Sequence, residues 1–273
     1  MPTSPPALPS HHLETLDAFL VALNRASADV ILPLFRVENG LENKAGPGDF
    51  DPVTAADKGA EAAIRKLIAE RHPEHGVIGE EYGEDRPDAE FVWVLDPVDG
   101  TRAFIAGLPV WTTLIGLRFQ GRPVLGSIGQ PYVGEIFIGH AGATRLMARG
   151  GEQPLRVRPC AQLSDAVIAT TDPNLFRGSK YAAWERLRTA VRLSRYGCDA
   201  YAYAMVAAGC LDLVIERGLK SWDIDAALPV IAGAGGLVTD WSGQPVGAHG
   251  GDVVISGGEA CLSQALLLLA ASA

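Results

Sequence analysis

Apolar residues recur at intervals of three or four positions in two segments of the N-terminal part of the chain. One segment covers residues 13–34, and the other covers residues 57–71, where Ile64 and Ile68 fall on the same side. This spacing predicts two amphipathic helices, each with one face packed against a core.

The middle of the chain changes to short apolar runs that are typical of strands. A run around Val77 and another at residues 91–95 predict two buried strands. Residues 112–140 hold further β-rich runs, separated by glycine-containing segments at 121–123 and 132–134. This pattern predicts an antiparallel meander.

Beyond residue 159, strand-like and helix-like segments alternate, which predicts a mixed α/β (α+β) fold. We expect residues 13–273 to form a single domain with an α+β part over about 13–158 and an α/β part over about 159–273. Residues 1–12 are expected to form a disordered arm. The predicted strands lie at 166–170, 192–195, 211–216 and 252–256, and the predicted helices at 179–191, 200–209, 223–234 and 259–271.

Composition and charge narrow the range of partners. Of the 273 residues, 48% are hydrophobic and 31 are glycine, which suits a well-buried core. The 23 basic and 32 acidic residues give a net charge of −9, which argues against nucleic acid or an anionic membrane as a partner. Because no segment reaches membrane-spanning length and the N-terminus resembles no export leader, we expect a cytoplasmic protein.

The four cysteines form no CxxC pair. This spacing argues against a zinc knuckle or a redox dithiol. We expect the thiols to be reduced and mostly buried.

The most informative segment is Asp96-Pro97-Val98-Asp99-Gly100-Thr101, which follows the apolar run at 91–95. Its two aspartates are placed where a buried strand leaves the core. Gly100 permits a tight turn, and the N–H groups of Gly100 and Thr101 come at the start of the next segment. The segment therefore predicts a site for hard cations and a phosphate, although Asp-Pro and Asp-Gly are also ordinary turn dipeptides.

Two further acidic clusters lie at element ends. Glu80 and Glu81 follow a short apolar piece, and Asp223 stands at an expected helix start. Three such clusters suggest one shared site. Its ligands would all be oxygens, which favours Mg²⁺ over zinc.

Taken together, these motifs resemble the signature set of the inositol monophosphatase superfamily of Mg²⁺-dependent phosphatases. The set comprises Gly79-Glu80-Glu81, residues 96–101, Trp222-Asp223 and an upstream segment at 51–57, and the similarity extends from about Leu13 to Leu268. The resemblance implies a layered α/β/α/β/α sandwich of the inositol monophosphatase and fructose-1,6-bisphosphatase type. It also implies a homodimer and a small phosphate monoester as substrate.

Within that superfamily, the sequence looks closest to the histidinol-phosphate phosphatase branch. The residues that carry this closer resemblance are found in four segments, 101–109, 170–176, 196–204 and 218–220.

The resemblance implies two or three Mg²⁺ ions per site. Glu80, Asp96 and the carbonyl of Val98 would hold the first ion, and Asp96, Asp99 and Asp223 the second. A ligand role and a helix-capping role for Asp223 do not exclude each other, since both belong at a helix start.

The same resemblance implies the catalytic roles. Glu80 and Thr101 would orient the attacking water, and Asp57 would hydrogen-bond Thr101 and help to carry the water's proton. The N–H groups of Gly100 and Thr101 would bind phosphate, and Glu81 would support the ligands. Asp57 and Thr101 could instead be only helix caps.

Two further residues are weaker candidates near the site. Lys44 is in a Gly/Pro-rich loop that resembles the family's mobile loop, although a solvated lysine explains it equally well. Asp225 is expected to face away from Asp223 on a helix, so we do not expect it to be a ligand.

Asp199 and Glu216 are the candidates for recognising the leaving group. A carboxylate pair suits an amino alcohol such as L-histidinol, whose cationic groups can pair with it. Asp199 could instead be an N-cap, and polyol-specific relatives also carry a glutamate where Glu216 stands. Asn174 could lie nearby, although its turn chemistry also explains it.

The sequence therefore favours an Mg²⁺-dependent histidinol-phosphate phosphatase that acts in histidine biosynthesis. An inositol-1-phosphate phosphatase or a broad sugar-phosphate phosphatase is the main alternative. A 3′-phosphoadenosine nucleotidase would need basic and aromatic residues that the chain does not cluster. A non-catalytic binding protein on the same fold is the alternative from another class, but none of the expected ligands is missing.

Overall fold

The computed structural model describes residues 10–37, 42–43, 52–140 and 142–270. It contains an eight-stranded sheet in the order β10-β9-β8-β7-β6-β5-β3-β4 and a five-stranded sheet in the order β12-β11-β13-β15-β14. A short pair, β1 (Glu42–Asn43) and β2 (Pro52–Val53), stands apart from both. None of the described helices is both long and apolar enough to cross a membrane.

The eight-stranded sheet contains the predicted meander. All its neighbouring strands are antiparallel except β3 and β5, which run parallel. The meander continues past residue 140 through two strands that the apolar pattern did not predict, β9 and β10. The strands are β3 (Gly76–Gly79), β4 (Gly83–Asp85), β5 (Phe91–Asp99), β6 (Thr112–Phe119), β7 (Arg122–Gln130), β8 (Glu135–His140), β9 (Ala143–Ala148) and β10 (Gly151–Leu155).

The five-stranded sheet is mixed. Its centre, β13, is parallel to β11 and antiparallel to β15. β14 is an edge strand that the sequence did not predict, because its residues are only partly buried and show no apolar run. The strands are β11 (Val167–Thr170), β12 (Leu193–Tyr196), β13 (Leu213–Leu219), β14 (Leu237–Asp240) and β15 (Gly251–Ser256).

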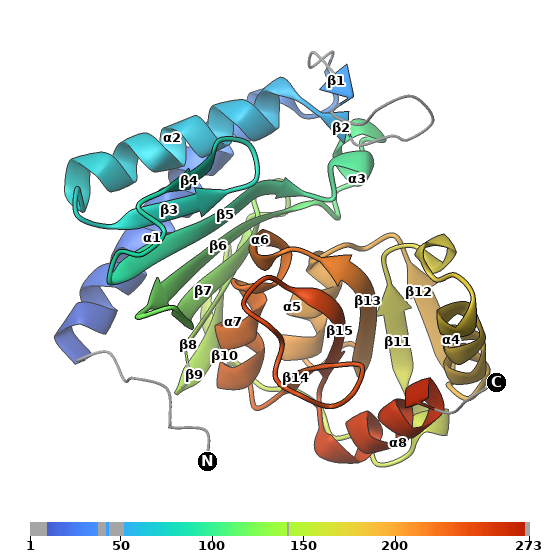
Figure 1. Ribbon diagram of the computed structural model, residues 1–273. Helices are drawn as coiled ribbons and strands as arrows, with labels where there is room; N and C mark the ends of the chain where they lie inside the picture. The colour runs from blue at the N-terminus through green and yellow to red at the C-terminus, as the bar shows by residue number, and fades with distance from the viewer. Residues whose placement is uncertain (1–9, 38–41, 44–51, 141, 271–273) are drawn as a thin grey trace.

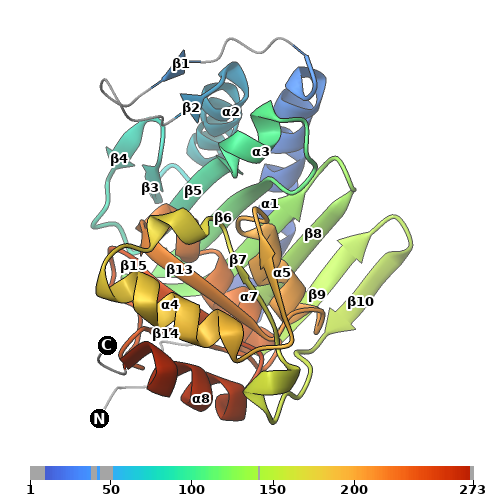
Figure 2. The same cartoon turned by 90° about the vertical axis from the view of Figure 1, so that its right-hand side faces the viewer.

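Helices cover the outer faces of both sheets and fill the space between them (Figure 1). α1 (Ser10–Ile31) and α2 (Ala55–Arg71) bury apolar side chains against the large sheet. α5 (Tyr201–Ala207) and α7 (Ala227–Gly233) share a core with both sheets. α4 (Ser179–Thr189) and α8 (Glu259–Ala270) pack on the far side of the small sheet. The layered α/β/α/β/α arrangement is thus confirmed, and Figure 2 shows it from the end at which α4 and α8 lie in front of the small sheet.

The prediction of a single helix over residues 223–234 is wrong, because the structure has two short helices there. α6 (Ser221–Ile224) ends before α7 begins at Ala227. The reason is Pro229, which lacks an N–H and would break the interior of one continuous helix. Starting a new helix at Ala227 places Pro229 in the first turn, where proline is tolerated.

The N-terminal helix also differs from its prediction. α1 begins at Ser10, so residues 10–12 are helical and do not belong to an arm, while residues 1–9 lie outside the described part. After α1 the chain continues into a short 3-10 helix, Leu32–Leu34.

The cysteine prediction is correct for the free thiols but wrong for their burial. All four thiols are free. Only Cys261 is buried, whereas Cys160 and Cys198 are half-buried and Cys210 is exposed.

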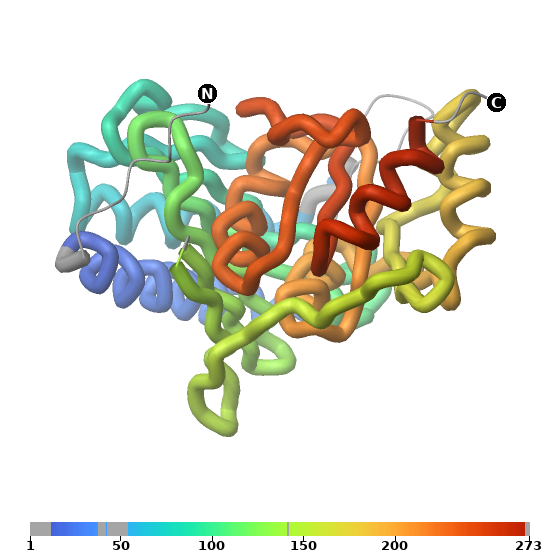
Figure 3. The backbone as a smooth tube through the Cα atoms, turned by 90° about the horizontal axis from the view of Figure 1, so that it is seen from below, coloured from blue at the N-terminus to red at the C-terminus, as the bar shows by residue number. Residues whose placement is uncertain are grey.

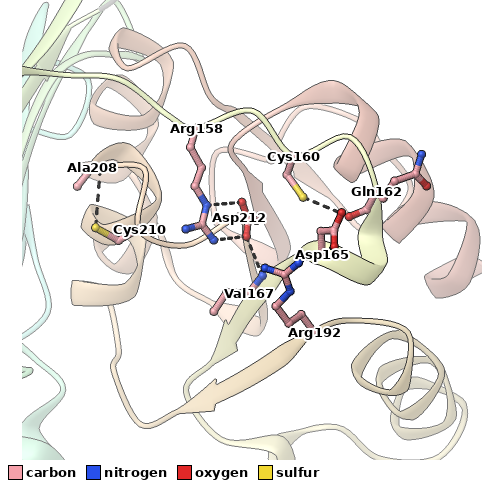
Figure 4. A network of polar contacts seen from close by, with 9 residues as sticks. All are labelled: Arg158, Cys160, Gln162, Asp165, Val167, Arg192, Ala208, Cys210 and Asp212. Atoms are coloured by element: carbon pink, nitrogen blue, oxygen red, sulfur yellow. Dashed lines mark hydrogen bonds and ion pairs between the residues drawn. The ribbon is translucent and has the colours of Figure 1, made fainter.

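After β10 the chain crosses to the second sheet, as the yellow-green segment of Figure 3 shows. Arg158, in this crossing, donates through Nε to Oδ1 of Asp212 at 2.7 Å and also binds its other oxygen. The N–H of Val167 donates to Oδ2 of Asp212 at 2.7 Å (Figure 4). The buried Asp212 thus fastens the crossing segment to the start of β11.

Candidate active site

The site begins where β5 ends. The register of β5 against β6 shifts between Asp96 and Asp99, so the strand bulges around Pro97. Asp96 is only 3% exposed, and its Oδ1 accepts a hydrogen bond from the Val98 N–H at 3.1 Å. Gly100 then turns the chain with a φ of +83°, which suits glycine, into α3 (Thr101–Ile105).

Thr101 connects this turn to α2. Its hydroxyl lies 3.0 Å from the carbonyl oxygen of Val98 and 3.2 Å from Oδ1 of Asp57. The hydrogen bond predicted between Asp57 and Thr101 is therefore present. The hydroxyl has one proton, so it can donate to only one of these two acceptors at a time.

Neither Asp57 nor Thr101 occupies an N-cap position, although Asp57 does take part in capping α2. Thr54 is the N-cap of α2, and Asp57 is the third residue of its capping box. Oδ2 of Asp57 accepts from the Thr54 N–H at 2.8 Å and from the Thr54 hydroxyl at 2.5 Å. The N-cap of α3 is Gly100. Asp57 is thus held by the start of one helix against the start of another.

Glu80 and Glu81 follow β3, which pairs in parallel with β5 so that Gly79 lies opposite Leu95. The N–H of Glu80 donates to the carbonyl of Leu95 at 3.2 Å. This register places Glu80 beside Asp96, in agreement with the prediction of one shared site.

Glu61 holds this loop, and sequence reasoning missed it. Its side chain is fully buried and accepts from the N–H groups of Glu81 at 2.8 Å and Tyr82 at 3.1 Å. A Cβ on Gly79 would lie 2.1 Å from Oε1 of Glu61, so glycine is needed there. Glu61 stands four positions after Asp57 on the same face of α2, and this spacing was the available signal.

The C-terminal half contributes Asp199, Glu216 and Asp223. Asp99 joins the two halves, because its Oδ2 accepts from the Ala200 N–H at 2.7 Å. Asp223, in α6, accepts from the Lys220 N–H at 2.6 Å and so takes part in capping as expected.

Asp199 lies against the phosphate-binding turn proposed at Gly100. A Cβ on Gly100 would be 2.9 Å from Oδ2 of Asp199. Asp199 has a φ of +43°, a strained value for a residue with a side chain, and the N-cap of α5 is Ala200. The alternative of Asp199 as an N-cap is therefore wrong.

Glu216, in β13, is 2% exposed. Its Oε1 accepts from the N–H of Thr171 at 2.8 Å and from the hydroxyl of Thr171 at 3.0 Å. These bonds fix the carboxyl group at the end of the small sheet that faces the site.

Electrostatics show that these acids form one group. Burial raises the pKa of Asp96 well above its usual range, and the charges of Glu80, Asp99, Asp223 and Asp57 raise it further. Burial also raises the pKa of Asp199 and of Asp223 to about 6 each. Burial raises the pKa of Glu216 to about 8, against the opposing effect of the Thr171 hydrogen bonds. A bound cation would offset the mutual repulsion of these buried carboxylates and would favour their ionised forms.

The residues present fit Mg²⁺, since they offer carboxylate and carbonyl oxygens without histidine or thiolate. Within the described residues, however, three ligand atoms approach within 4.8 Å of one another only at His72, Glu74 and His75. Among the site acids, Asp99 and Asp223 accept hydrogen bonds from the backbone N–H groups of Ala200 and Lys220.

The histidine group at the other end of α2 is not a good metal site. The indole N–H of Trp93 donates to Nδ1 of His75 at 3.1 Å. A neutral His75 therefore carries its proton on Nε2, which lies 3.3 Å from Glu74. Nε2 then has no lone pair for a metal.

The remaining residues that the sequence singled out are Lys44, Asn174 and Asp225. Lys44 lies outside the described residues. Asn174 donates through its backbone and side-chain nitrogens to Asp172, both at 2.8 Å, as its turn chemistry predicted. Asp225 is buried and paired with Arg118.

Comparison with known proteins agrees with this geometry. The chain matches the inositol monophosphatase family over residues 12–272. It is 44% identical to bifunctional phosphatase IMPL2, chloroplastic, of Arabidopsis thaliana over 88% of this chain and 68% of that protein. It is 32% identical to a histidinol-phosphatase of Chlorobaculum parvum over 72% of this chain and 75% of that protein.

Among solved structures, an inositol monophosphatase from Zymomonas mobilis matches with a TM-score of 0.84 and 38% identity. The match covers 94% of this chain and 98% of that one. Because the family match spans almost the whole chain and the fold agrees, the protein belongs to the inositol monophosphatase family of phosphatases.

Proposed function

We propose that the protein is an Mg²⁺-dependent histidinol-phosphate phosphatase, which hydrolyses L-histidinol phosphate to L-histidinol and phosphate in histidine biosynthesis. Residues 13–273 would act as one catalytic domain. The cytoplasmic location and the homodimer expected from the sequence belong to the same proposal.

The observation that carries this proposal is the position of Asp199. Its carboxyl group lies against Gly100, next to the N–H groups proposed to bind phosphate. Glu216 lies near enough that its charge raises the pKa of Asp99, as the charge of Asp199 also does. A leaving group attached to phosphate at Gly100 would therefore meet two carboxyl groups, and a cation on the leaving group would favour their ionised forms. Such a pair favours a cationic amino alcohol over a neutral polyol.

The ligands proposed for two or three Mg²⁺ ions are Glu80, Asp96, Asp99, Asp223 and the carbonyl of Val98. When bound, Mg²⁺ would neutralise the phosphate oxygens and lower the pKa of a coordinated water.

The chain's own groups would position the reactants. The N–H groups of Gly100 and Thr101 would bind a phosphate oxygen at the start of α3. Glu80 and the hydroxyl of Thr101 would orient the attacking water. Asp57 accepts from this hydroxyl, so a proton from the water could pass through Thr101 to Asp57. Glu81 would support Glu80 through the loop that Glu61 holds.

The test is phosphate release by the purified protein with Mg²⁺, using L-histidinol phosphate, inositol-1-phosphate and 3′-phosphoadenosine 5′-phosphate side by side. We expect L-histidinol phosphate to be preferred about a hundredfold in kcat/KM, which is about 3 kcal/mol of transition-state binding. EDTA should stop the release.

Asp199→Asn is the decisive variant. It should lose most of this preference while it keeps turnover of inositol-1-phosphate. Asp96→Asn should lose activity on every substrate. Equal or better turnover of inositol-1-phosphate by the unmodified protein would instead establish an inositol-1-phosphate or broad sugar-phosphate phosphatase, as the Zymomonas mobilis structure suggests. The absence of EDTA-sensitive release from all three substrates would favour a non-catalytic binding protein.

A further inference from the structure

Two of the four free cysteines lie beside each other on the side of the small sheet that α8 covers. Cys160 is in the segment that crosses between the sheets, and Cys261 is in the first turn of α8. Cys160 packs against the apolar cluster that contains Cys261, and the two thiols interact directly. The sequence did not reveal this pair, because residues 161–260 separate the two cysteines.

Gln264 ties the chain after Cys160 to α8. Its Nε2 donates to the carbonyl of Ala161 at 2.9 Å, and its Oε1 accepts from the N–H of Leu163 at 3.1 Å. Gln264 stands three positions after Cys261, so it lies on the same side of the helix. These bonds hold the crossing segment over the turn of α8 that carries Cys261.

Asp212 holds the chain before each cysteine. Nε of Arg158, two residues before Cys160, donates to Oδ1 of Asp212 at 2.7 Å (Figure 4). The N–H of Gly257, four residues before Cys261, donates to the carbonyl of Asp212 at 2.9 Å. Both cysteines are therefore held by the same residue on one side and by Gln264 on the other. Two thiols that the fold keeps together form a disulfide with little further loss of chain freedom.

The two thiols differ in exposure and therefore in reactivity. Cys160 is half-buried, whereas Cys261 is 0% exposed. Burial raises the pKa of Cys261 above its usual range, and the adjacent Cys160 thiol raises it further. Cys160 is thus the sulfur that a solute meets first, while Cys261 stays protonated and reaches only its neighbour. A redox-sensitive cysteine is often found next to a second cysteine of this kind, which resolves the first product.

We propose that Cys160 and Cys261 form a redox-modification site, which becomes a disulfide by exchange with a low-molecular-weight disulfide such as glutathione disulfide. The Cys160 thiolate attacks one sulfur of the oxidant, forms a mixed disulfide and releases a thiolate, which takes up the proton that Cys160 lost. Cys261 then loses its proton and attacks Sγ of Cys160, which releases the second glutathione as a thiol. Two protein thiols are oxidised, and one glutathione disulfide is reduced to two thiols. In a reducing compartment the pair stays as two thiols.

The disulfide would cross-link the part of the protein that carries the small sheet. The closed loop extends from Cys160 to Cys261 and includes Asp199, Glu216 and Asp223. A cross-link over about 100 residues restricts the unfolded chain, so the oxidised protein should unfold at a temperature about 10 °C higher.

The cysteine pair and the acidic residues of the active site belong to opposite ends of β11. Val167, its first residue, donates to Asp212 at 2.7 Å, and Thr171, which follows its last residue, donates to Glu216 at 2.8 Å. Oxidation should therefore raise stability and leave the kcat for phosphate release unchanged.

The experiment equilibrates the purified full-length protein in buffers that range from reduced glutathione alone to about a hundredfold excess of glutathione disulfide. The remaining thiols are trapped with N-ethylmaleimide, and mass spectrometry of peptides identifies the linked cysteines. We expect one disulfide, between Cys160 and Cys261, in excess glutathione disulfide and none in reduced glutathione. Thermal unfolding of the two samples then measures the gain in stability.

Three variants locate the reaction. Cys160→Ala should form no disulfide, and its unfolding temperature should not depend on the glutathione buffer. Cys261→Ala should stop at the mixed disulfide between Cys160 and glutathione. The matched control is Cys210→Ala, which removes an exposed cysteine outside the pair and should oxidise as the unmodified protein does. Cys160→Ala decides the question alone if Cys261→Ala does not fold.

Four results would overturn the proposal. They are a pair that stays reduced in excess glutathione disulfide, a disulfide that joins Cys160 to Cys198 or Cys210, a mixed disulfide that persists on Cys160 of the unmodified protein, and equal unfolding temperatures for the oxidised and reduced samples. The third result would show that Cys261 does not reach the sulfur of Cys160.

Discussion

Glu61 shows how one buried carboxylate can set the position of a catalytic loop. It accepts two loop N–H groups and pairs with Arg65 through Nε at 2.7 Å. The loop carries Glu80, which is proposed to bind metal and water. The position of Glu80 therefore depends on a residue that does not itself belong to the reaction.

Replacing Glu61 by alanine should lower the free energy of unfolding by about 3 kcal/mol, because two N–H groups and Arg65 lose their acceptor. The kcat for any substrate should fall as well, since Glu80 is no longer held. Urea unfolding and phosphate release measure the two effects. The matched control is Glu70→Ala on the same helix, whose 3.9 Å ion pair with Lys66 is exposed and should cost less than about 0.5 kcal/mol.

A Glu61→Ala protein with unchanged stability and kcat would contradict this account. So would a loss of the same size in Glu70→Ala, because the effect would then follow from removing any glutamate of α2.

Single residues also show which candidate site residues could be proposed from the sequence alone. Asp96, Asp99, Glu80 and Asp223 could be proposed because each follows a short apolar run or stands near a helix start, which the local pattern reveals. Glu61 is in the middle of a helix, and its importance comes from the close approach of Gly79. That contact depends on how α2 packs on the sheet, which no local pattern contains.

At the scale of elements, the start of α2 links helix stability to the proposed chemistry. Thr54 caps the helix and also donates its hydroxyl to Asp57. Asp57 in turn accepts from Thr101 at the start of α3.

Thr54→Ala should destabilise the protein by about 1 kcal/mol, the usual cost of losing an N-cap. It should also lower kcat, because Asp57 loses one of the donors that orient it. Thr54→Ser keeps the hydroxyl and should retain both properties. If Thr54→Ala lowers stability but leaves kcat unchanged, the cap does not position Asp57.

Asp212 joins the segment that crosses between the sheets to β11, and it should make stability depend on pH. Burial raises its pKa, but the hydrogen bonds from Arg158 and Val167 outweigh burial and hold the pKa below its usual value. A folded-state pKa below the unfolded value near 3.9 means that the stabilisation is complete above about pH 4. It is lost as the pH falls through the folded-state pKa.

Asp212→Asn should therefore cost about 2 kcal/mol at neutral pH, less than a fully buried pair because the Arg158 side chain is 38% exposed. Below about pH 4 the variant and the unmodified protein should converge. Urea unfolding across this pH range measures both. Asp165→Asn, which removes the exposed partner of Arg192, is the control and should change little. A constant difference at all pH values would exclude the ion pair as the cause.

The elements that the sequence did not predict depend on tertiary contacts more than on a local apolar pattern. β14 is an edge strand with no apolar alternation, and its pairing with β15 makes it a strand. The break between α6 and α7 could have been predicted from Pro229, but the apolar spacing on both sides concealed it. The helix α2, with strong apolar periodicity, was predicted with nearly correct bounds. The strand β5 was predicted from its apolar run at 91–95, but it continues to Asp99.

At the scale of the molecule, the candidate active site lies where the two halves meet. Asp57, Glu80, Asp96 and Asp99 come from the part that carries the large sheet. Asp199, Glu216 and Asp223 come from the part that carries the small sheet. Without a cation, the mutual repulsion of these acids opposes the packing of one half on the other.

Mg²⁺ should therefore stabilise the whole protein. At a concentration a hundred times its Kd, a single bound ion that ignores the unfolded chain adds about 2.7 kcal/mol. The unfolding temperature should rise with Mg²⁺ and fall again with EDTA. Sodium chloride at matched ionic strength is the control, and an equal rise with it would show general screening in place of binding.

The variant Asp96→Asn separates two effects, which are the repulsion among the acids in the metal-free protein and the stabilisation by bound Mg²⁺. Asparagine keeps an acceptor for the Val98 N–H and does not ionise, so it avoids the cost that the raised pKa of Asp96 imposes on the folded state at neutral pH. The metal-free variant should therefore be more stable than the metal-free unmodified protein by about 1 kcal/mol. The same variant should gain no stability from Mg²⁺ and should have no phosphatase activity. Asp88→Asn removes an exposed charge and should show none of these changes. Because an acid kept only for packing would make the variant less stable, the sign of this difference shows whether Asp96 serves the fold or the metal.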